Sequence, residues 1–246
     1  MKKLFTSEAV TEGHPDKLCD RISDAVLDAM LRKDPASRVA CETFATTGLV
    51  VVGGEISTDC YVDIPKLVRE TICEVGYDRP EAGFDGNTCA VLTSIDSQSP
   101  DISMGVTGSM EVKEGRTKDK EALLGAGDQG MVFGYACDDT VDLMPLPITL
   151  ANKLAYQLTQ ARKTGAIPFI LPDGKTQVTV SYGPDGKPSG LETIVISTQH
   201  LPGVEQMDLA TALVDNVLYQ ALGDMNLEGV RILVNPTGRF VKGGPA

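Results

Sequence analysis

The chain has 246 residues, which is enough for one large domain or two smaller ones. Because 42% of the residues are hydrophobic and 23% are charged, a mostly disordered chain is excluded, and no apolar run reaches the ~18 residues of a membrane span. The formal net charge of −12 argues against a general nucleic-acid surface. The N-terminus lacks the apolar stretch of a signal peptide, and the six cysteines form no CxxC pair. These features predict a cytoplasmic protein with reduced thiols and no structural zinc.

Turn residues and hydrophobic periodicity divide the chain into two halves with the same order of elements. The first half is expected to contain a strand at 4–7, a helix at 15–33, a hairpin of strands at 38–47 and 49–57, a helix at 64–75 capped by Gly76, and a buried strand at 89–95. The second half is expected to contain a strand at 131–137, a helix at 146–163, strands at 177–182 and 192–197, a helix at 207–222 and a strand at 230–235. The pattern predicts an α+β protein with a repeated strand-helix-strand-strand-helix-strand unit.

Between the halves, residues 96–128 are rich in Ser, Gly and charged side chains and contain at most a short helix at 117–124. A segment this long without structure is either a linker or a mobile cover of an active site. The sequence alone leaves both interpretations open.

The first candidate site is "EGHPDK", Glu12 to Lys17, at the start of the first expected helix. Pro15 favours the first helical position, so His14 is expected at the N-cap, with Asp16 and Lys17 in the first turn. Free N–H groups, the helix dipole, an imidazole and a lysine at one point suit a phosphate, and Asp16 suits a magnesium ion bridging to that phosphate. The alternative is that Asp16 only compensates the helix dipole and that His14 is an ordinary surface residue.

Three later segments strengthen the phosphate interpretation, although each also has a purely structural one. "GAGDQG" (125–130) lets backbone approach a ligand around Asp128, or simply makes a turn. "PDGK" (172–175) is either a β-turn or the carrier of a ligand-binding lysine. "NPTGRF" (235–240) offers Arg239 for phosphate and Phe240 for stacking on a base, or forms a surface loop. His200 has no partner nearby in sequence and is interpreted as structural.

No Ser-His-carboxylate spacing, HExxH or Walker loop is present, so triad hydrolases, zinc proteases and P-loop enzymes are not expected. In order along the chain, "EGHPDK", "ACETFATTGLVVVGGE", "SQSPDI", "GAGDQG", "LPDGK", "STQH" and "NPTGRF" closely resemble S-adenosylmethionine synthetase, also called methionine adenosyltransferase. The resemblance runs from Leu4 to Ala246.

The resemblance implies attack of the methionine sulfur on the ribose 5′ carbon of ATP, with tripolyphosphate expelled and then hydrolysed to pyrophosphate and phosphate. A thioether has no proton to lose, so the missing general base is expected; the reaction needs alignment and cations around a polyanion. The resemblance also implies the cofactors Mg²⁺ and K⁺, and dimers or tetramers with the site at the subunit interface. No nucleic-acid or membrane partner is expected, because the chain is acidic and has no apolar run long enough for a membrane span.

Matched position by position, the resemblance implies a role for each candidate residue. His14, Lys175 and Arg239 are the expected catalytic residues, and Asp16 and Glu42 the expected ligands of magnesium and potassium. Methionine is expected at Glu55, Gln98 and Asp128. ATP is expected at His14, Asp173, Gly174, Lys175, Arg239 and Phe240.

The family's fold repeats the unit three times, which implies two of three pseudo-symmetric units here. We therefore expect a first α+β unit at 1–101, a flexible active-site loop and connector at 102–127, a second unit at 128–233, and the start of a third region at 234–246 that is truncated at its C-terminus. The loop from Ser97 to Leu124 is longer than the family's. The sequence leaves two alternative functions open: an adenosyltransferase, and a non-catalytic fragment that pairs with intact subunits.

Overall fold

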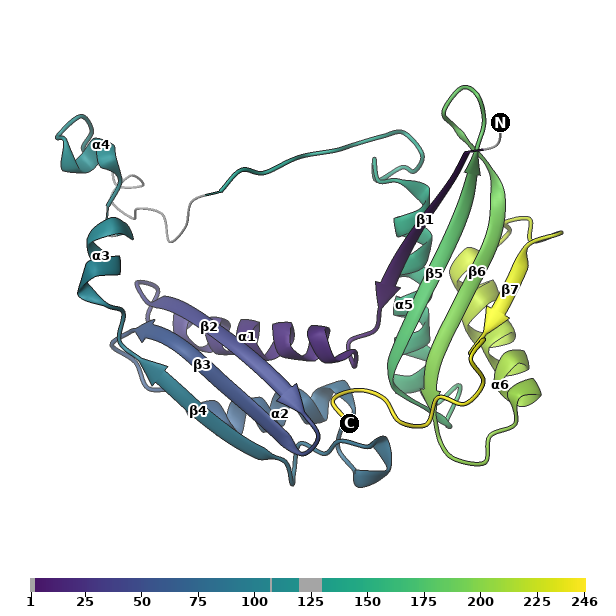
Figure 1. Cartoon of the computed structure of the whole chain (residues 1–246), viewed down its shortest axis with the longest axis horizontal. Helices are drawn as coiled ribbons and strands as arrows, with labels where there is room; N and C mark the ends of the chain where they lie inside the picture. Colours follow the sequence, from purple (N-terminus) through teal and green to yellow (C-terminus); the bar gives the residue numbers. More distant parts are fainter. Residues whose placement is uncertain (1–2, 107, 120–129) are drawn as a thin grey trace.

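The computed structural model describes residues 3–106, 108–119 and 130–246. Its core consists of two β-sheets, each with helices packed on one face (Figure 1). The strand order is β2-β3-β4 in the first sheet and β1-β5-β6-β7 in the second. This architecture confirms the predicted α+β class.

The first sheet is built from a hairpin and a crossover strand. Its strands are β2 (Arg38–Thr46), antiparallel to β3 (Leu49–Ser57), and β4 (Ala90–Asp96), parallel to β3. The turn contains Gly48 with φ of 70°, a left-handed conformation that glycine adopts without steric cost. The helices α1 (Pro15–Leu31) and α2 (Ile64–Val75) cover one face, and a short 3₁₀ helix η1 (Pro80–Ala82) follows. The predicted hairpin and the predicted Gly76 cap of α2 are both confirmed.

The expected buried strand at 89–95 is instead an exposed edge strand. In β4 every side chain is exposed or half-buried, and Leu92 is 56% exposed. Its apolar run resembles a strand covered on both faces, but α1 and α2 cover only one face of this sheet. The other face presents Phe44, 63% exposed, next to polar and acidic side chains.

The second sheet repeats the sequence of elements of the first. It contains α5 (Leu146–Lys163), the antiparallel pair β5 (Ile170–Tyr182) and β6 (Pro188–His200), α6 (Gln206–Leu213), a π-helical turn η3 (Val214–Leu218), α7 (Tyr219–Leu222), and β7 (Arg231–Val234), parallel to β6. A helix, an antiparallel pair, a helix and a parallel strand therefore occur twice. This confirms the predicted repeat for these elements.

The strand that opens the chain lies in the second sheet. β1 (Lys3–Val10) pairs antiparallel with β5, from Lys3 opposite Tyr182 to Val10 opposite Lys175 (Figure 1). The first unit, expected at 1–101, therefore contributes its first strand to the second sheet. As a consequence, the "EGHPDK" segment that follows β1 lies beside the start of β5.

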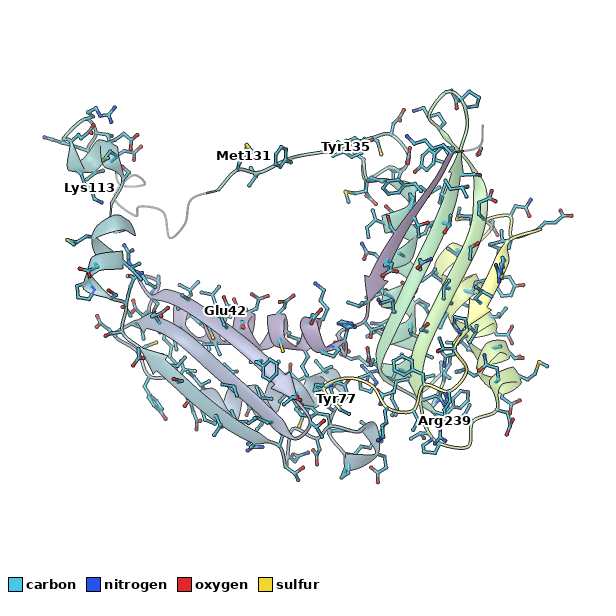
Figure 2. The ribbon with its side chains drawn as sticks, in the orientation of Figure 1. Glu42, Tyr77, Lys113, Met131, Tyr135 and Arg239 are labelled. Atoms are coloured by element: carbon cyan, nitrogen blue, oxygen red, sulfur yellow. The ribbon has the colours of Figure 1, made fainter. Side chains whose placement is uncertain are left out.

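The predicted strand at 131–137 is wrong: these residues are extended but belong to neither sheet. Met131, Val132 and Phe133 are 78%, 97% and 86% exposed. Figure 2 shows Met131 on a stretch of chain that lies apart from both sheets. A strand requires hydrogen bonds to a neighbouring strand, and no sheet edge in the described ranges pairs with this segment.

Between β4 and this segment, the chain forms the short helices α3 (Pro100–Val106) and α4 (Met110–Lys113). Figure 1 shows both helices past the upper left end of the first sheet. The helix predicted at 117–124 falls mostly outside the described residues. Among the residues that the structure describes, no helix has both the length and the apolar character needed to cross a bilayer.

Candidate functional site

The N-terminus of α1 has the predicted geometry. His14 is the N-cap, with φ of −62° and ψ of 139°, and Pro15 is the first helical residue. His14 Nδ1 accepts a hydrogen bond from the Asp16 backbone N–H at 3.3 Å. Because Nδ1 acts as an acceptor, the neutral ring carries its proton on Nε2, which leaves a donor for a ligand.

"EGHPDK" packs directly against "LPDGK". Thr11, the residue just before this segment, donates its hydroxyl to the Pro172 carbonyl at 2.7 Å and its N–H to the Gly174 carbonyl at 2.9 Å. A Cβ at Gly13 would lie 2.4 Å from the Pro172 carbonyl carbon, so only glycine fits there without a shift. The contact fixes His14 beside the start of β5.

"PDGK" is not the predicted β-turn alternative but an irregularity inside β5. The pairing of β5 with β6 moves from Ile170 opposite His200 to Gly174 opposite Thr198, so three residues of β5 face one residue of β6. Such a bulge bends the strand and redirects side chains. It places Asp173, only 8% exposed, against the Gly244 N–H, which donates to its carboxylate at 2.7 Å. Burial raises the pKa of Asp173, while this N–H and His14 act in the opposite direction.

"NPTGRF" forms the turn that follows β7. Asn235 has a φ of 39°, which non-glycine residues rarely adopt and asparagine tolerates best. Its buried side chain accepts from the Thr198 N–H at 2.8 Å and donates to the Thr198 carbonyl at 3.0 Å. The turn closes with the Gly238 N–H donating to the Asn235 carbonyl at 2.7 Å, and Arg239 and Phe240 follow.

These three segments and β6 enclose one cavity of about 340 Å³. It is lined by His14, Asp173, Gly174, Lys175, Ser197, Asn235, Thr237, Arg239 and Phe240. All of the residues predicted to bind ATP are therefore brought together. Lys175 and Arg239 supply two cationic side chains, and His14 adds a donor, which together suit a phosphate chain.

Several lining residues were not singled out from the sequence. These are the uncharged residues Ser197, Asn235 and Thr237, which lie in ordinary strand and turn contexts. Only Asn235 has a local sequence signal, because it follows a strand and precedes a proline. Glu8 was also missed: its carboxylate lies 3.3 Å from Lys175 Nζ, and both side chains are about half exposed. Its position on β1 reaches Lys175 only through the pairing of β1 with β5.

The remaining predicted residues lie elsewhere. Glu42 on β2 and Glu55 on β3 are exposed, and the strand register puts both on the sheet face that α1 and α2 do not cover. Figure 2 shows Glu42 on the first sheet, away from Arg239 beside the second. Gln98 is half-buried between β4 and α3, and Asp128 lies outside the described residues.

The expected metal ligands form no closed site. In the described part of the chain no group of three His, Cys, Asp or Glu side chains could hold an ion. Two carboxylates flank His14 in the sequence. Glu8 precedes it on β1, and Asp16, which is 89% exposed, follows it in the first turn of α1. That donor set fits a magnesium ion whose other ligands are phosphate oxygens and water, because Mg²⁺ takes one or two carboxylates in such sites. Glu42 likewise offers K⁺ a single carboxylate.

A larger cavity of about 480 Å³ contains none of the predicted residues. It lies between the start of β1, the β5–β6 hairpin and the segment before α5, and its walls include Phe5, Tyr135 and Tyr182. The Tyr182 hydroxyl donates to Asp139 at 2.9 Å, and Lys187 pairs with Asp138. Its cations, Lys3 and Lys187, are outnumbered by three aspartates, whereas the smaller cavity has two cations and one carboxylate, so the smaller cavity is the candidate site for a phosphate.

The repeated unit and the cation-lined cavity define a class: an α+β protein of two similar units, with a cavity lined by Lys175, Arg239 and His14 where the two units meet. Comparison with known families makes this specific. Residues 2–100 match the S-adenosylmethionine synthetase N-terminal domain, and residues 123–240 match the central domain of the same enzyme. The chain therefore belongs to the S-adenosylmethionine synthetase family, a family of methionine adenosyltransferases that use metal ions, bind ATP and methionine, and are oligomeric.

Proposed function

We propose that the chain binds ATP and L-methionine and forms S-adenosylmethionine by attack of the methionine sulfur on the ribose 5′ carbon. Tripolyphosphate is the leaving group and is hydrolysed to pyrophosphate and phosphate. The observation that carries this proposal is the 340 Å³ cavity, where residues from four separate segments combine two cations, a histidine donor and an aromatic ring.

The charge distribution of the cavity suits a reaction that needs no general base. A thioether sulfur attacks without losing a proton, so the rate depends on alignment and on stabilising the negative leaving group. Lys175 and Arg239 would hold the phosphates, and the Nε2–H of His14 would donate to the departing oxygen. Phe240 would stack on the adenine, and the buried Asp173 and the Gly174 backbone would complete the nucleotide side.

Asp16 would hold Mg²⁺ on the phosphate side, and Glu42 would hold K⁺. When bound, Mg²⁺ would neutralise part of the phosphate charge. We assign methionine to Glu55, Gln98 and Asp128, and the segment that begins at Gln98 to a cover of the site.

The exposed face of the first sheet supports a homo-oligomeric site. Glu42 and Glu55 share this face with the exposed Phe44 and Leu92, and neither glutamate lines the cavity. A dimer, or a tetramer of dimers, that packed this face against a second copy would bring both carboxylates to a site between subunits. The same exposed face favours the second candidate function, a non-catalytic chain that pairs with intact subunits.

The test is S-adenosylmethionine formation by mass spectrometry, with ATP, L-methionine, Mg²⁺ and K⁺. His14→Asn and Lys175→Met should each lower the product at least ~100-fold, the cost of losing one well-placed electrostatic group. The matched control is Lys153→Met, which removes the same charge from the exposed side of α5. Product that is insensitive to both site variants would contradict the proposal; nucleotide binding without product would favour the pairing function.

A further inference from the structure

The last residues of β6, Thr198-Gln199-His200, hold the segment that presents Arg239 and Phe240. Thr198 binds the Asn235 side chain through both of its backbone groups, as described above. The Gln199 side-chain amide donates to the Val241 carbonyl at 3.1 Å and to the Ala82 carbonyl of the first unit at 3.0 Å. The cation and the ring of the candidate site thus stand between two fixed points, Asn235 and Val241.

His200 fixes the backbone between those two points. Its own N–H donates to the Phe240 carbonyl at 3.0 Å, and its ring Nε2 accepts from the Phe240 N–H at 3.2 Å. Both backbone groups of Phe240 are therefore bound by one residue. A single pivot at Phe240 would allow the adjoining Arg239 to swing, whereas two bonds on opposite backbone groups restrict that rotation.

The surroundings of the ring determine its tautomer. Nδ1 lies 2.9 Å from the Leu201 carbonyl, which can only accept, so Nδ1 carries the proton. Nε2 is consequently unprotonated and is an acceptor suited to the Phe240 N–H. The residue is only 5% exposed and both ring nitrogens are used inside the chain, so His200 is not free to bind substrate or transfer a proton.

We infer that His200 is a positioning residue: it sets Arg239 and Phe240 in the cavity by holding the Phe240 backbone through Nε2. We call the two hydrogen bonds between His200 and the Phe240 backbone the clamp. The expected effect on nucleotide affinity rests on the proposed function, whereas the clamp does not. It also gives the "STQH" segment a role that sequence alone did not reveal.

Two substitutions separate the ring nitrogens. His200→Gln can place an amide oxygen near the position of Nε2, whereas His200→Asn reaches only the position of Nδ1. In His200→Asn we expect the Phe240 amide to exchange with deuterium at least roughly fivefold faster, the factor that one neutral hydrogen bond typically supplies. His200→Gln should restore exchange to within about twofold of wild type, and amides at the centre of β6 should be unchanged in both.

The same variants are then titrated with a non-hydrolysable ATP analogue bearing a β,γ-imido bridge, in the presence of Mg²⁺. The expected result is weaker binding, by roughly fivefold, in His200→Asn and near wild-type binding in His200→Gln. Equal exchange and equal affinity in the two variants would overturn the inference. If wild type does not bind the analogue, the proposed function fails, and the exchange of Phe240 still decides whether the clamp exists.

Discussion

Glu12 joins the two units, and its replacement by glutamine should be among the most destabilising single changes of charge in the chain. Its carboxylate lies 2.7 Å from Arg162 Nη2 and 2.7 Å from Lys163 Nζ, both at the end of α5, and 3.0 Å from Arg21 Nη1 on α1. Arg162 also donates to the Val75 carbonyl at the end of α2, at 2.7 Å. One carboxylate therefore connects α1 with α5 directly, and Arg162 extends the connection to α2.

The magnitude follows from the burial of each partner. Glu12 and Arg162 are 16% and 13% exposed, whereas Arg21 and Lys163 are about 40% exposed. Breaking a buried pair typically costs ~3–5 kcal/mol because the remaining charge is uncompensated, and an exposed pair contributes ~0–1 kcal/mol. Since glutamine still accepts one hydrogen bond, we expect Glu12→Gln to lower the free energy of unfolding by about 2–3 kcal/mol.

The assay is urea unfolding followed by far-UV circular dichroism for Glu12→Gln, Arg162→Met, the double variant and Lys163→Met. Lys163→Met should cost less than about 1 kcal/mol. The double variant should cost less than the sum of its single changes, because removing both partners leaves no unpaired buried charge. Equal effects of Glu12→Gln and Lys163→Met, or strict additivity, would refute the reasoning.

Two further predictions concern the contacts behind the cavity and the loop after α1. Tyr77→Phe removes a fully buried hydroxyl that donates to the Gly13 carbonyl at 2.5 Å, so urea unfolding should show a loss of about 1–3 kcal/mol; an unchanged midpoint would contradict this. Hydrogen bonds from the Asp59 N–H, the Thr58 hydroxyl and the Ala36 N–H lower the pKa of Asp34 below its usual 3.8. A depressed carboxyl pKa stabilises the fold above the unfolded-state value and loses that contribution as pH falls through the folded-state value. Below about pH 4, the free energy of unfolding of Asp34→Asn should therefore fall less steeply with pH than that of the wild type. Parallel pH profiles of the two proteins would show that these hydrogen bonds contribute nothing.

Sequence patterns predicted well the elements whose signals are local. Gly48 marks its hairpin and Gly76 ends α2 because each adopts a left-handed conformation that few other residues tolerate. β1 was predicted as a strand, but its partner β5 lies more than 160 residues away, and no local signal specifies that pairing. The segment 131–137 has the composition of a strand, yet a strand exists only when another strand pairs with it.

The candidate site shows the same division. The place of His14 at a helix N-terminus follows from Pro15. In contrast, "PDGK" forms a bulge and not an isolated turn because β5 pairs with β6, which the local sequence does not specify. His200 has no partner close in sequence because its partner, Phe240, is 40 residues further along the chain. Glu42 and Glu55 fall on one face by strand alternation, and the sequence does not say which face the helices cover.

The central claim, that one cavity holds the phosphate chain of ATP, is tested most directly by calorimetric titration with the imido analogue of ATP and Mg²⁺. Lys175→Met should weaken binding by about 10- to 100-fold, the range of a hydrogen bond to a charged group, while Lys153→Met should stay within about twofold. Equal affinities of the two variants would mean that the phosphates do not bind at Lys175 and that the cavity is not the nucleotide site.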